Sequence, residues 1–286
     1  MKTSKIDQMN RASVTQLLTE AGCIAAREEA DQLIRAAAGD QEVLCSLISR
    51  RIGGEPIAWL TGGVNFCGVE LFVAPGVYVP RWQTEPLARR AAALLPTGGV
   101  AADLCTGAGA IAAVLAAAVP TARVVATELD GAAAQCARRN GVEVFEGCLD
   151  DPLPRELERR VDVLTAVAPY VPTDSLRLLP RDVQAFEPRL ALDGGADGTD
   201  VLAEIARKSI RWLRPGGWLL LELGGDQADP VGKLLSELGF VGLDVMADEY
   251  GDPRAICAQL GSGCSTSGAP AGFPPGSFAL GLVDDR

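Results

Sequence analysis

A short loop with two glycines is the segment of this chain whose residue types most clearly suggest chemistry. It reads Asp103-Leu104-Cys105-Thr106-Gly107-Ala108-Gly109 and lies between a predicted strand and a predicted helix. Gly107 and Gly109 let the backbone turn tightly and approach a ligand without a Cβ in the way. Glu128 ends the next predicted strand, roughly 20 residues later, where a carboxylate can accept hydrogen bonds from both hydroxyls of a ribose. This order of residues indicates a site for a cofactor that contains a nucleoside.

The loop by itself leaves the identity of that cofactor open. The pattern Gly107-x-Gly109-x-x-Ala112 also fits the dinucleotide fingerprint of NAD-dependent dehydrogenases. A tight turn that binds nothing is a third interpretation. Two features favour S-adenosylmethionine. Asp103 stands at the end of the strand, where its carboxylate can help to hold the loop and the amino-acid portion of this methyl donor. The chain also closes with two predicted strands that have no helix between them, and the antiparallel hairpin they predict is typical of methyltransferases.

The composition argues against several other kinds of site. The chain has no histidine, which removes Ser-His-Asp and Cys-His catalysis and every metal site built on imidazole. Its eight cysteines never occur as C-x-x-C, so we expect reduced thiols and no metal site. The net charge of −11 argues against direct binding of nucleic acid. With no apolar run of membrane-spanning length and no signal peptide at the N-terminus, we expect a cytoplasmic protein without a membrane partner.

The N-terminal part of the chain predicts helices followed by a hairpin. Residues 12–51 carry apolar side chains at three- and four-residue spacing, and Asp40 could cap one of these helices. The segments 64–73 and 77–80 look extended and predict a short hairpin. The chain after Gly261 is rich in Gly, Ser, Pro and Ala. We therefore predict a helical N-terminal domain that engages the substrate (1–60), a hairpin linker (61–81), a domain that binds the methyl donor (82–260) and a disordered tail (261–286).

The long central part alternates between strands and helices. Predicted helices cover 84–95, 109–118, 130–140, 200–213 and 226–238. Predicted strands cover 100–104, 123–128, 142–145, 161–167, 218–223, 240–243 and 255–260. Apolar strands that alternate with helices imply a parallel sheet with both faces covered. The predicted fold is an α/β, Rossmann-like domain with a mostly parallel seven-stranded sheet and an antiparallel edge hairpin.

A series of short motifs follows in order between about residues 50 and 260. They are Gly54-Glu55-Pro56-Ile57, Val79-Pro80-Arg81 with Thr84-Glu85, the Asp103 loop, Asp151-Pro152-Leu153-Pro154, Ala168-Pro169-Tyr170-Val171-Pro172, Glu187-Pro188-Arg189-Leu190-Ala191-Leu192, Gly194-Gly195-Ala196-Asp197-Gly198 and Leu221-Glu222-Leu223-Gly224. In these motifs the chain resembles the HemK/PrmC-type protein-(glutamine-N5) methyltransferases, class I enzymes that modify the Gly-Gly-Gln glutamine of peptide-chain release factors. The resemblance implies S-adenosyl-L-methionine as the methyl donor and a release factor, or another protein, as the acceptor.

The resemblance also implies roles for individual residues. It places the loop around the methionine part of the donor, Glu128 on the ribose and Leu149 against the adenine. It makes the segment after the fourth strand the acceptor site. The implied donor residues are Asp103, Cys105, Thr106, Gly107, Ala108, Gly109, Glu128, Leu149 and Val167, and the implied catalytic residues are Val167, Ala168, Pro169 and Tyr170.

At three positions the chain departs from the family pattern. The family has Asn-Pro-Pro-Tyr where this chain has Val167-Ala168-Pro169-Tyr170, and the family Asn accepts one hydrogen bond from the acceptor amide. Valine cannot accept this hydrogen bond, although the Ala168 carbonyl could supply a second contact. Losing one such bond costs about 1–3 kcal/mol, or roughly tenfold to hundredfold in rate. Cys148 replaces an Asp near the adenine. Cys105 replaces a Gly, which is tolerated if its φ is negative.

Other functions remain open at this point. The altered acceptor segment is more apolar, which favours a small-molecule acceptor in a biosynthetic pathway as one alternative. A second alternative is a relative that binds S-adenosylmethionine without catalysis, in which Pro169 and Tyr170 only pack. A DNA adenine methyltransferase is disfavoured by the acidic charge and by the lack of a target-recognition insert.

Overall fold

A computed structural model describes residues 9–263 of the chain, so most of the predicted tail lies outside the described residues. The N-terminal part forms four helices: α1 (Arg11–Glu20), α2 (Ala26–Ala37), α3 (Gln41–Ile52) and α4 (Ile57–Thr61). Asp40 caps α3 as predicted, because its Oδ1 accepts hydrogen bonds from the backbone nitrogens of Glu42 and Val43 at 2.9 and 3.1 Å. Buried leucines, among them Leu18 and Leu33, give this helical unit a core of its own.

The hairpin after the helical unit differs from the predicted one. Both of its strands, β1 (Gly63–Phe66) and β2 (Val69–Phe72), lie inside the single segment that was expected to be extended, and Cys67 and Gly68 form the turn with positive φ. The prediction of a strand at 77–80 is wrong. Pro75-Gly76 and Pro80 interrupt the segment, and the Val77 carbonyl accepts a hydrogen bond from Trp59 Nε1 at 3.0 Å instead of pairing in a sheet.

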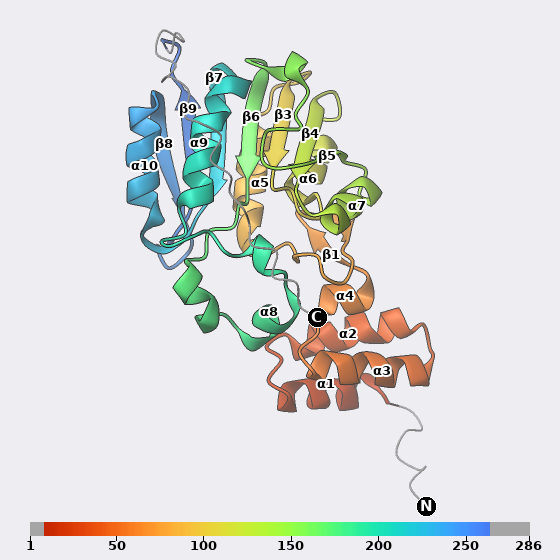
Figure 1. Cartoon of the computed structure of the whole chain (residues 1–286). Coiled ribbons are helices and arrows are strands. Elements are labelled where there is room, and N and C mark those ends of the chain that lie inside the picture. The colour runs from red at the N-terminus through yellow and green to blue at the C-terminus, as the bar shows by residue number, and fades with distance from the viewer. Residues whose placement is uncertain (1–8, 264–286) are drawn as a thin grey trace, which may run out of the picture.

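The central part forms the predicted seven-stranded sheet, with strand order β5-β4-β3-β6-β7-β9-β8 (Figure 1). The strands are β3 (Val100–Leu104), β4 (Arg123–Glu128), β5 (Glu143–Glu146), β6 (Val161–Ala166), β7 (Leu213–Glu222), β8 (Phe240–Ala247) and β9 (Pro253–Leu260). The pairings from β5 to β7 are parallel, whereas β9 is antiparallel to both β7 and β8. The prediction of a Rossmann-like sheet with an antiparallel hairpin is therefore confirmed.

Helices cover both faces of this sheet. They are α5 (Glu85–Leu94), α6 (Ala110–Ala118), α7 (Gly131–Arg139), α9 (Asp200–Trp212) and α10 (Ala228–Glu237). Along β7, Leu219 and Leu221 belong to the core under α9 and α10, while Leu220 belongs to the core under α5 and α6. This alternation is what a strand with both faces buried requires. Every residue of β6 is buried, so β6 is a central strand whose carboxyl end is held firmly.

The connection from β6 to α9 contains short helices that the sequence did not predict. These are the α-helix α8 (Arg181–Phe186) and the 3-10 helices η3 (Thr173–Leu178) and η4 (Arg189–Ala191), each preceded by a proline. Figure 1 shows that this connection extends from the sheet toward the helical unit. There the Phe186 ring lies edge-on to Trp59, with centroids 6.1 Å apart. Three further 3-10 turns are η1 (Trp82–Thr84), η2 (Arg155–Leu157) and η5 (Gly225–Gln227).

Within residues 9–263, no helix combines the length and the apolar character that a membrane crossing requires.

Candidate active site

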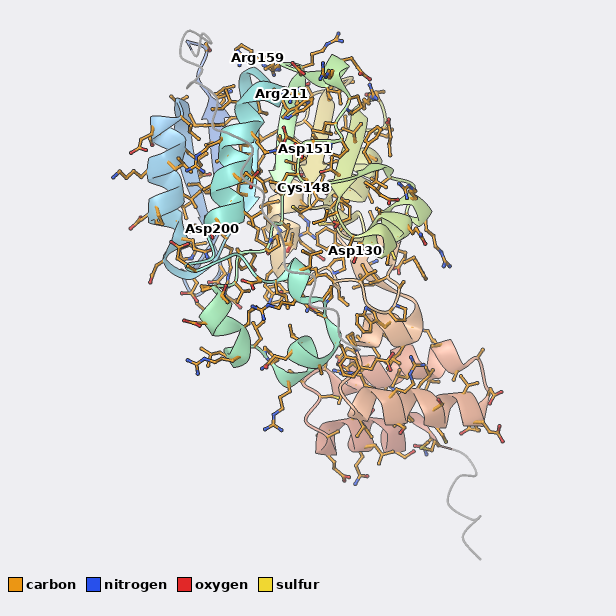
Figure 2. All side chains as sticks on the ribbon, in the orientation of Figure 1. Asp130, Cys148, Asp151, Arg159, Asp200 and Arg211 are labelled. Atoms are coloured by element: carbon orange, nitrogen blue, oxygen red, sulfur yellow. The ribbon has the colours of Figure 1, made fainter. Side chains whose placement is uncertain are left out.

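A cavity of about 710 Å³ lies at the carboxyl ends of β3, β4 and β6, the edge where ligands bind in open α/β sheets. Its wall combines residues predicted for the donor with residues predicted for the acceptor: Cys105, Gly107, Glu128, Leu149, Val167 and Tyr170. Figure 2 shows how different elements surround the space, with Asp130 before α7, Asp200 at the start of α9 and Cys148 after β5. The fold thus brings the two predicted half-sites into one cavity of the size that small-molecule sites have.

Asp103 organises the loop at the end of β3. Its Oδ2 accepts a hydrogen bond from Thr106 Oγ1 at 2.5 Å, and its Oδ1 accepts one from Thr165 Oγ1 at 2.6 Å. The side chain is only 1% exposed, and burial raises its pKa to about 6 against the hydrogen bonds, which lower it. The carboxylate therefore connects the loop to the neighbouring strand β6. This agrees with the expectation that Asp103 helps to hold the loop.

The two loop glycines serve different purposes. Gly107 has a φ of +58°, and a Cβ there would meet nothing within 4 Å, so its backbone faces open space. Gly109 has a φ of +83°, and a Cβ there would lie 2.9 Å from Val142 Cγ2 and 3.1 Å from Ala137. Gly109 therefore allows α6 to pack closely and lines neither the cavity nor the smaller one beside it. Gly107 is the glycine that a ligand can approach.

Glu128, predicted to bind the ribose, lies at the end of β4 and lines the cavity. Its Oε2 accepts a hydrogen bond from the Gly107 nitrogen at 2.7 Å, and its Oε1 accepts one from the Asp130 nitrogen at 2.9 Å. Burial raises its pKa, and these backbone donors act in the opposite direction. Each carboxylate oxygen has a second lone pair left for a ribose hydroxyl.

Thr127, next to Glu128, also lines the cavity but was not predicted as a site residue. Its Oγ1 is buried and has no hydrogen-bond partner among the described residues. Buried hydroxyls are normally paired, so this atom fits a polar ligand. The signal that could have found Thr127 is its place at the end of a strand that points to the cavity. Thr127 lines the same cavity as Glu128, Gly107 and the apolar Leu149. Together these polar and apolar groups suit an adenosine group.

The backbone of Cys105 is a correction to the expectation from the sequence. Its φ is +54°, in the left-handed region, so the condition of a negative φ is not met. A Cβ in this conformation costs roughly 1–2 kcal/mol. Leu149 also has a positive φ, of 45°, and its side chain is buried in the wall of the cavity. Two non-glycine residues in the left-handed region therefore line the larger cavity.

A smaller cavity, of about 40 Å³, adjoins the first near the loop. Asp103, Thr106 and Ala108 line it from the loop, and residues that the sequence did not predict line it from the linker: Tyr78, Arg81 and Thr84. The Arg81 guanidinium lies 5.0 Å from the centroid of the Tyr78 ring and forms an ion pair with the buried Glu187. A cation and small polar groups in this position suit the methionine end of the donor.

The acceptor segment directly follows β6. Val167 lines both cavities, Ala168 is 2% exposed, and Pro169 and Tyr170 line the larger cavity. Tyr170 is held at both ends, because its Oη donates to Glu222 Oε1 at 3.2 Å and its carbonyl accepts from Gln227 Nε2 at 2.7 Å. The Val167 side chain contributes only hydrocarbon, so a polar contact at position 167 must come from the backbone.

No protein-family profile matches the chain, but individual proteins of known function are similar to it over most of its length. The chain is 37% identical to the release factor glutamine methyltransferase of Geobacter sulfurreducens over 221 residues, which cover 75% of this chain and 77% of that protein. It is 36% identical to the enzyme of the same name from Mycobacterium leprae, over 87% of this chain and 94% of that protein. It is also 38% identical to the 4-amino-L-phenylalanine/4-methylamino-L-phenylalanine methyltransferase of Streptomyces pristinaespiralis, over 67% of this chain and 69% of that protein.

A solved structure supports the fold independently of these relatives. The catalytic domain of hMettl16 superposes with a TM-score of 0.53 at 15% identity and covers 68% of this chain and 76% of that chain. The identities to the curated relatives are high enough, over enough of both chains, to establish the family. The chain belongs to the release factor glutamine methyltransferases and is an S-adenosylmethionine-dependent methyltransferase.

Proposed function

We propose that this enzyme methylates the side-chain amide nitrogen of a glutamine in a peptide-chain release factor. The observation that carries the proposal is the single cavity in which Val167–Tyr170 meets Gly107 and Glu128. An acceptor held against Tyr170 would lie beside a donor held by Glu128, as a direct transfer requires. An acceptor of this class also implies that the enzyme works in the cytoplasm, and the net charge of −11 favours a protein over a nucleic acid.

The chain's own residues would act by alignment in this reaction. S-adenosylmethionine supplies a methyl group on a positively charged sulfur. The amide nitrogen forms the new bond to carbon, the carbon–sulfur bond breaks with its electron pair going to sulfur, and the nitrogen releases a proton to water. No strong base is required, because the methylated amide is acidic while it carries the positive charge. The protein contributes orientation and a site that excludes water.

The helical unit supports a protein acceptor. Trp59, on α4, is 8% exposed and contacts Phe186 in the connection that follows the acceptor segment. The same connection forms the ion pair between Glu187 and Arg81 of the linker. A macromolecule bound along α1–α4 would therefore reach the mouth of the cavity through this connection.

The experiment that tests the proposal is methyl transfer from labelled S-adenosylmethionine to an unmodified release factor, with Val167→Asn in parallel. We expect transfer by the native enzyme and a roughly tenfold or greater increase in Val167→Asn, because asparagine restores a hydrogen-bond acceptor for the amide. Transfer by neither protein, with donor binding intact, would show that the acceptor is of another class.

A second candidate acceptor is a small aromatic amine. It is favoured by the hydrocarbon wall of Val167 and Leu190 and by the relative named for 4-amino-L-phenylalanine. An aromatic amine needs less help from hydrogen bonds than an amide, because its nitrogen is the better nucleophile. In the same assay, 4-amino-L-phenylalanine would be methylated by the native enzyme, and Val167→Asn would reduce the rate instead of increasing it.

A further inference from the structure

Glu222 is a buried carboxylate that has no role in the proposed reaction as described above. It is the last residue of β7, it is 5% exposed, and it lines neither cavity. Its Oε2 has no hydrogen-bond partner among the described residues. Burial raises its pKa, while Thr84 and Tyr170 act to lower it. Burying a carboxylate costs free energy of folding, so the residues that act on Glu222 can show what this carboxylate does.

The first neighbour of Glu222 is Tyr170 in the wall of the larger cavity. The Tyr170 hydroxyl donates to Glu222 Oε1 at 3.2 Å. Burial and the charge of Glu222 raise the pKa of Tyr170, so the hydroxyl keeps its proton and remains a donor. Gly224 lies beside the ring, since an added Cβ would be 3.4 Å from Tyr170 Cε2, an ordinary van der Waals distance. The ring is thus held at its hydroxyl by Glu222, and its edge lies next to Gly224.

The second residue that acts on Glu222 is Thr84, the last residue of η1, just after the linker. Its side chain is 5% exposed, and its hydroxyl acts to lower the pKa of Glu222. Thr84 lines the smaller cavity together with Arg81 and Asp103. Glu222 is therefore hydrogen-bonded to a residue that lines the larger cavity, and its pKa responds to a residue that lines the smaller one.

We propose that Glu222 is a positioning residue for methyl transfer, which fixes the Tyr170 ring in the acceptor wall and connects it to the donor site through Thr84. The inference rests on the proposed function in placing the acceptor against Tyr170. Its importance in this chain follows from Val167, which offers no polar atom to orient the acceptor. The shape of the wall, set largely by Tyr170, must then provide more of the alignment.

The kinetic test uses Glu222→Ala, Glu222→Gln, Tyr170→Phe and the double variant Glu222→Ala/Tyr170→Phe. Loss of the carboxylate should lower kcat about tenfold, with a smaller change in KM, because binding contacts remain while alignment is lost. Glu222→Gln keeps an oxygen that accepts from Tyr170 and should retain most of kcat. The double variant should be no slower than the slower single variant. Tyr250→Phe, at an 83% exposed tyrosine, is the matched control and should be unchanged.

A second measurement does not depend on the acceptor. The chain has three tyrosines, so fluorine NMR of protein labelled with 3-fluorotyrosine gives signals that Tyr→Phe variants assign. Glu222→Ala should shift the Tyr170 signal and leave that of Tyr250 in place. Thr84→Ala should move the Tyr170 signal in the native background and have little effect when Glu222 is already Ala.

The two measurements separate the possible failures. If the native enzyme methylates no acceptor, the proposed function fails, and the fluorine signals alone decide the role of Glu222. The inference is overturned if Glu222→Ala leaves the Tyr170 signal unchanged, if Thr84→Ala moves it equally in both backgrounds, or if the kinetic losses of the single variants multiply in the double variant.

Discussion

Glu128 Oε2 accepts a hydrogen bond from the backbone nitrogen of Gly107 at 2.7 Å, so the carboxylate predicted to bind the ribose also holds the glycine loop in place. On this prediction, one side chain both shapes the site and binds the donor. A change at Glu128 should affect donor binding twice, through the lost ribose contact and through the released loop.

Replacement of Glu128 by alanine should weaken donor binding by about 1.5–3 kcal/mol, because hydrogen bonds to a charged group are lost. This corresponds to roughly a tenfold to hundredfold rise in the dissociation constant of S-adenosylhomocysteine, measured by isothermal titration calorimetry. Glu143→Gln, at an exposed position on β5, is the control and should bind normally. If Glu128→Ala bound S-adenosylhomocysteine as tightly as the native protein, Glu128 would not be a donor-binding residue.

The pKa of Asp103 predicts how stability depends on pH. Because burial raises this pKa above that of the unfolded chain, Asp103 contributes stability below about pH 4, and this contribution is lost as the pH rises through the folded value of about 6. The difference between about 6 and 3.8 amounts to ~3 kcal/mol. The native protein should therefore lose most of this unfolding free energy relative to Asp103→Asn as the pH rises from 4 to 7. Urea unfolding of both proteins at pH 4 and pH 7 measures this loss. An equal change in unfolding free energy for the native protein and for Asp103→Asn would contradict the prediction.

The left-handed backbone of Cys105 predicts an unusual order of stability among its variants. Glycine adopts a φ of +54° freely, whereas alanine keeps the Cβ that causes the strain. We expect Cys105→Gly to be more stable than Cys105→Ala by about 1 kcal/mol in thermal or urea unfolding. The same pair of substitutions at Cys136, inside α7, should give the opposite order, because glycine weakens a helix.

The contact between Phe186 and Trp59 predicts a defect that is specific to the acceptor. Phe186→Ala removes an aromatic pair that joins the helical unit to the connection after the acceptor segment. We expect KM for a release factor to rise roughly threefold to tenfold, as the loss of an aromatic pair implies, while the affinity for S-adenosylhomocysteine stays the same. A small-molecule acceptor should be methylated normally by this variant. Weaker donor binding in Phe186→Ala would instead indicate a general loss of structure.

Much of the fold could be predicted from the sequence because its signals are local. The buried apolar runs gave the strands at 100–104 and 123–128 with the observed ends. The segment 77–80 looked equally extended, but its partner is the Trp59 side chain, a contact that no local pattern encodes. The short helix α8 was missed because six residues after a proline carry little periodicity.

The candidate site also contains residues that the sequence predicted and residues that it did not. The loop and Glu128 were identified because tight turns and acidic residues at strand ends leave a pattern in the sequence. Thr127 lies next to Glu128 at the same strand end, whereas Tyr78 lines the cavities only through the packing of distant elements. The φ of Cys105 could not be known, because the residue type that usually marks a left-handed position is glycine.

The position of β9 between β7 and β8 has a consequence for biosynthesis. β9 is the last strand within residues 9–263, yet it is an interior strand of the sheet, so β8 cannot join the sheet until β9 has been synthesised. Until Leu260 has emerged, β7 exposes an unpaired edge, which is the kind of surface that chaperones protect. The donor-binding domain should therefore fold only after its synthesis is complete, which makes it sensitive to truncation anywhere before this strand.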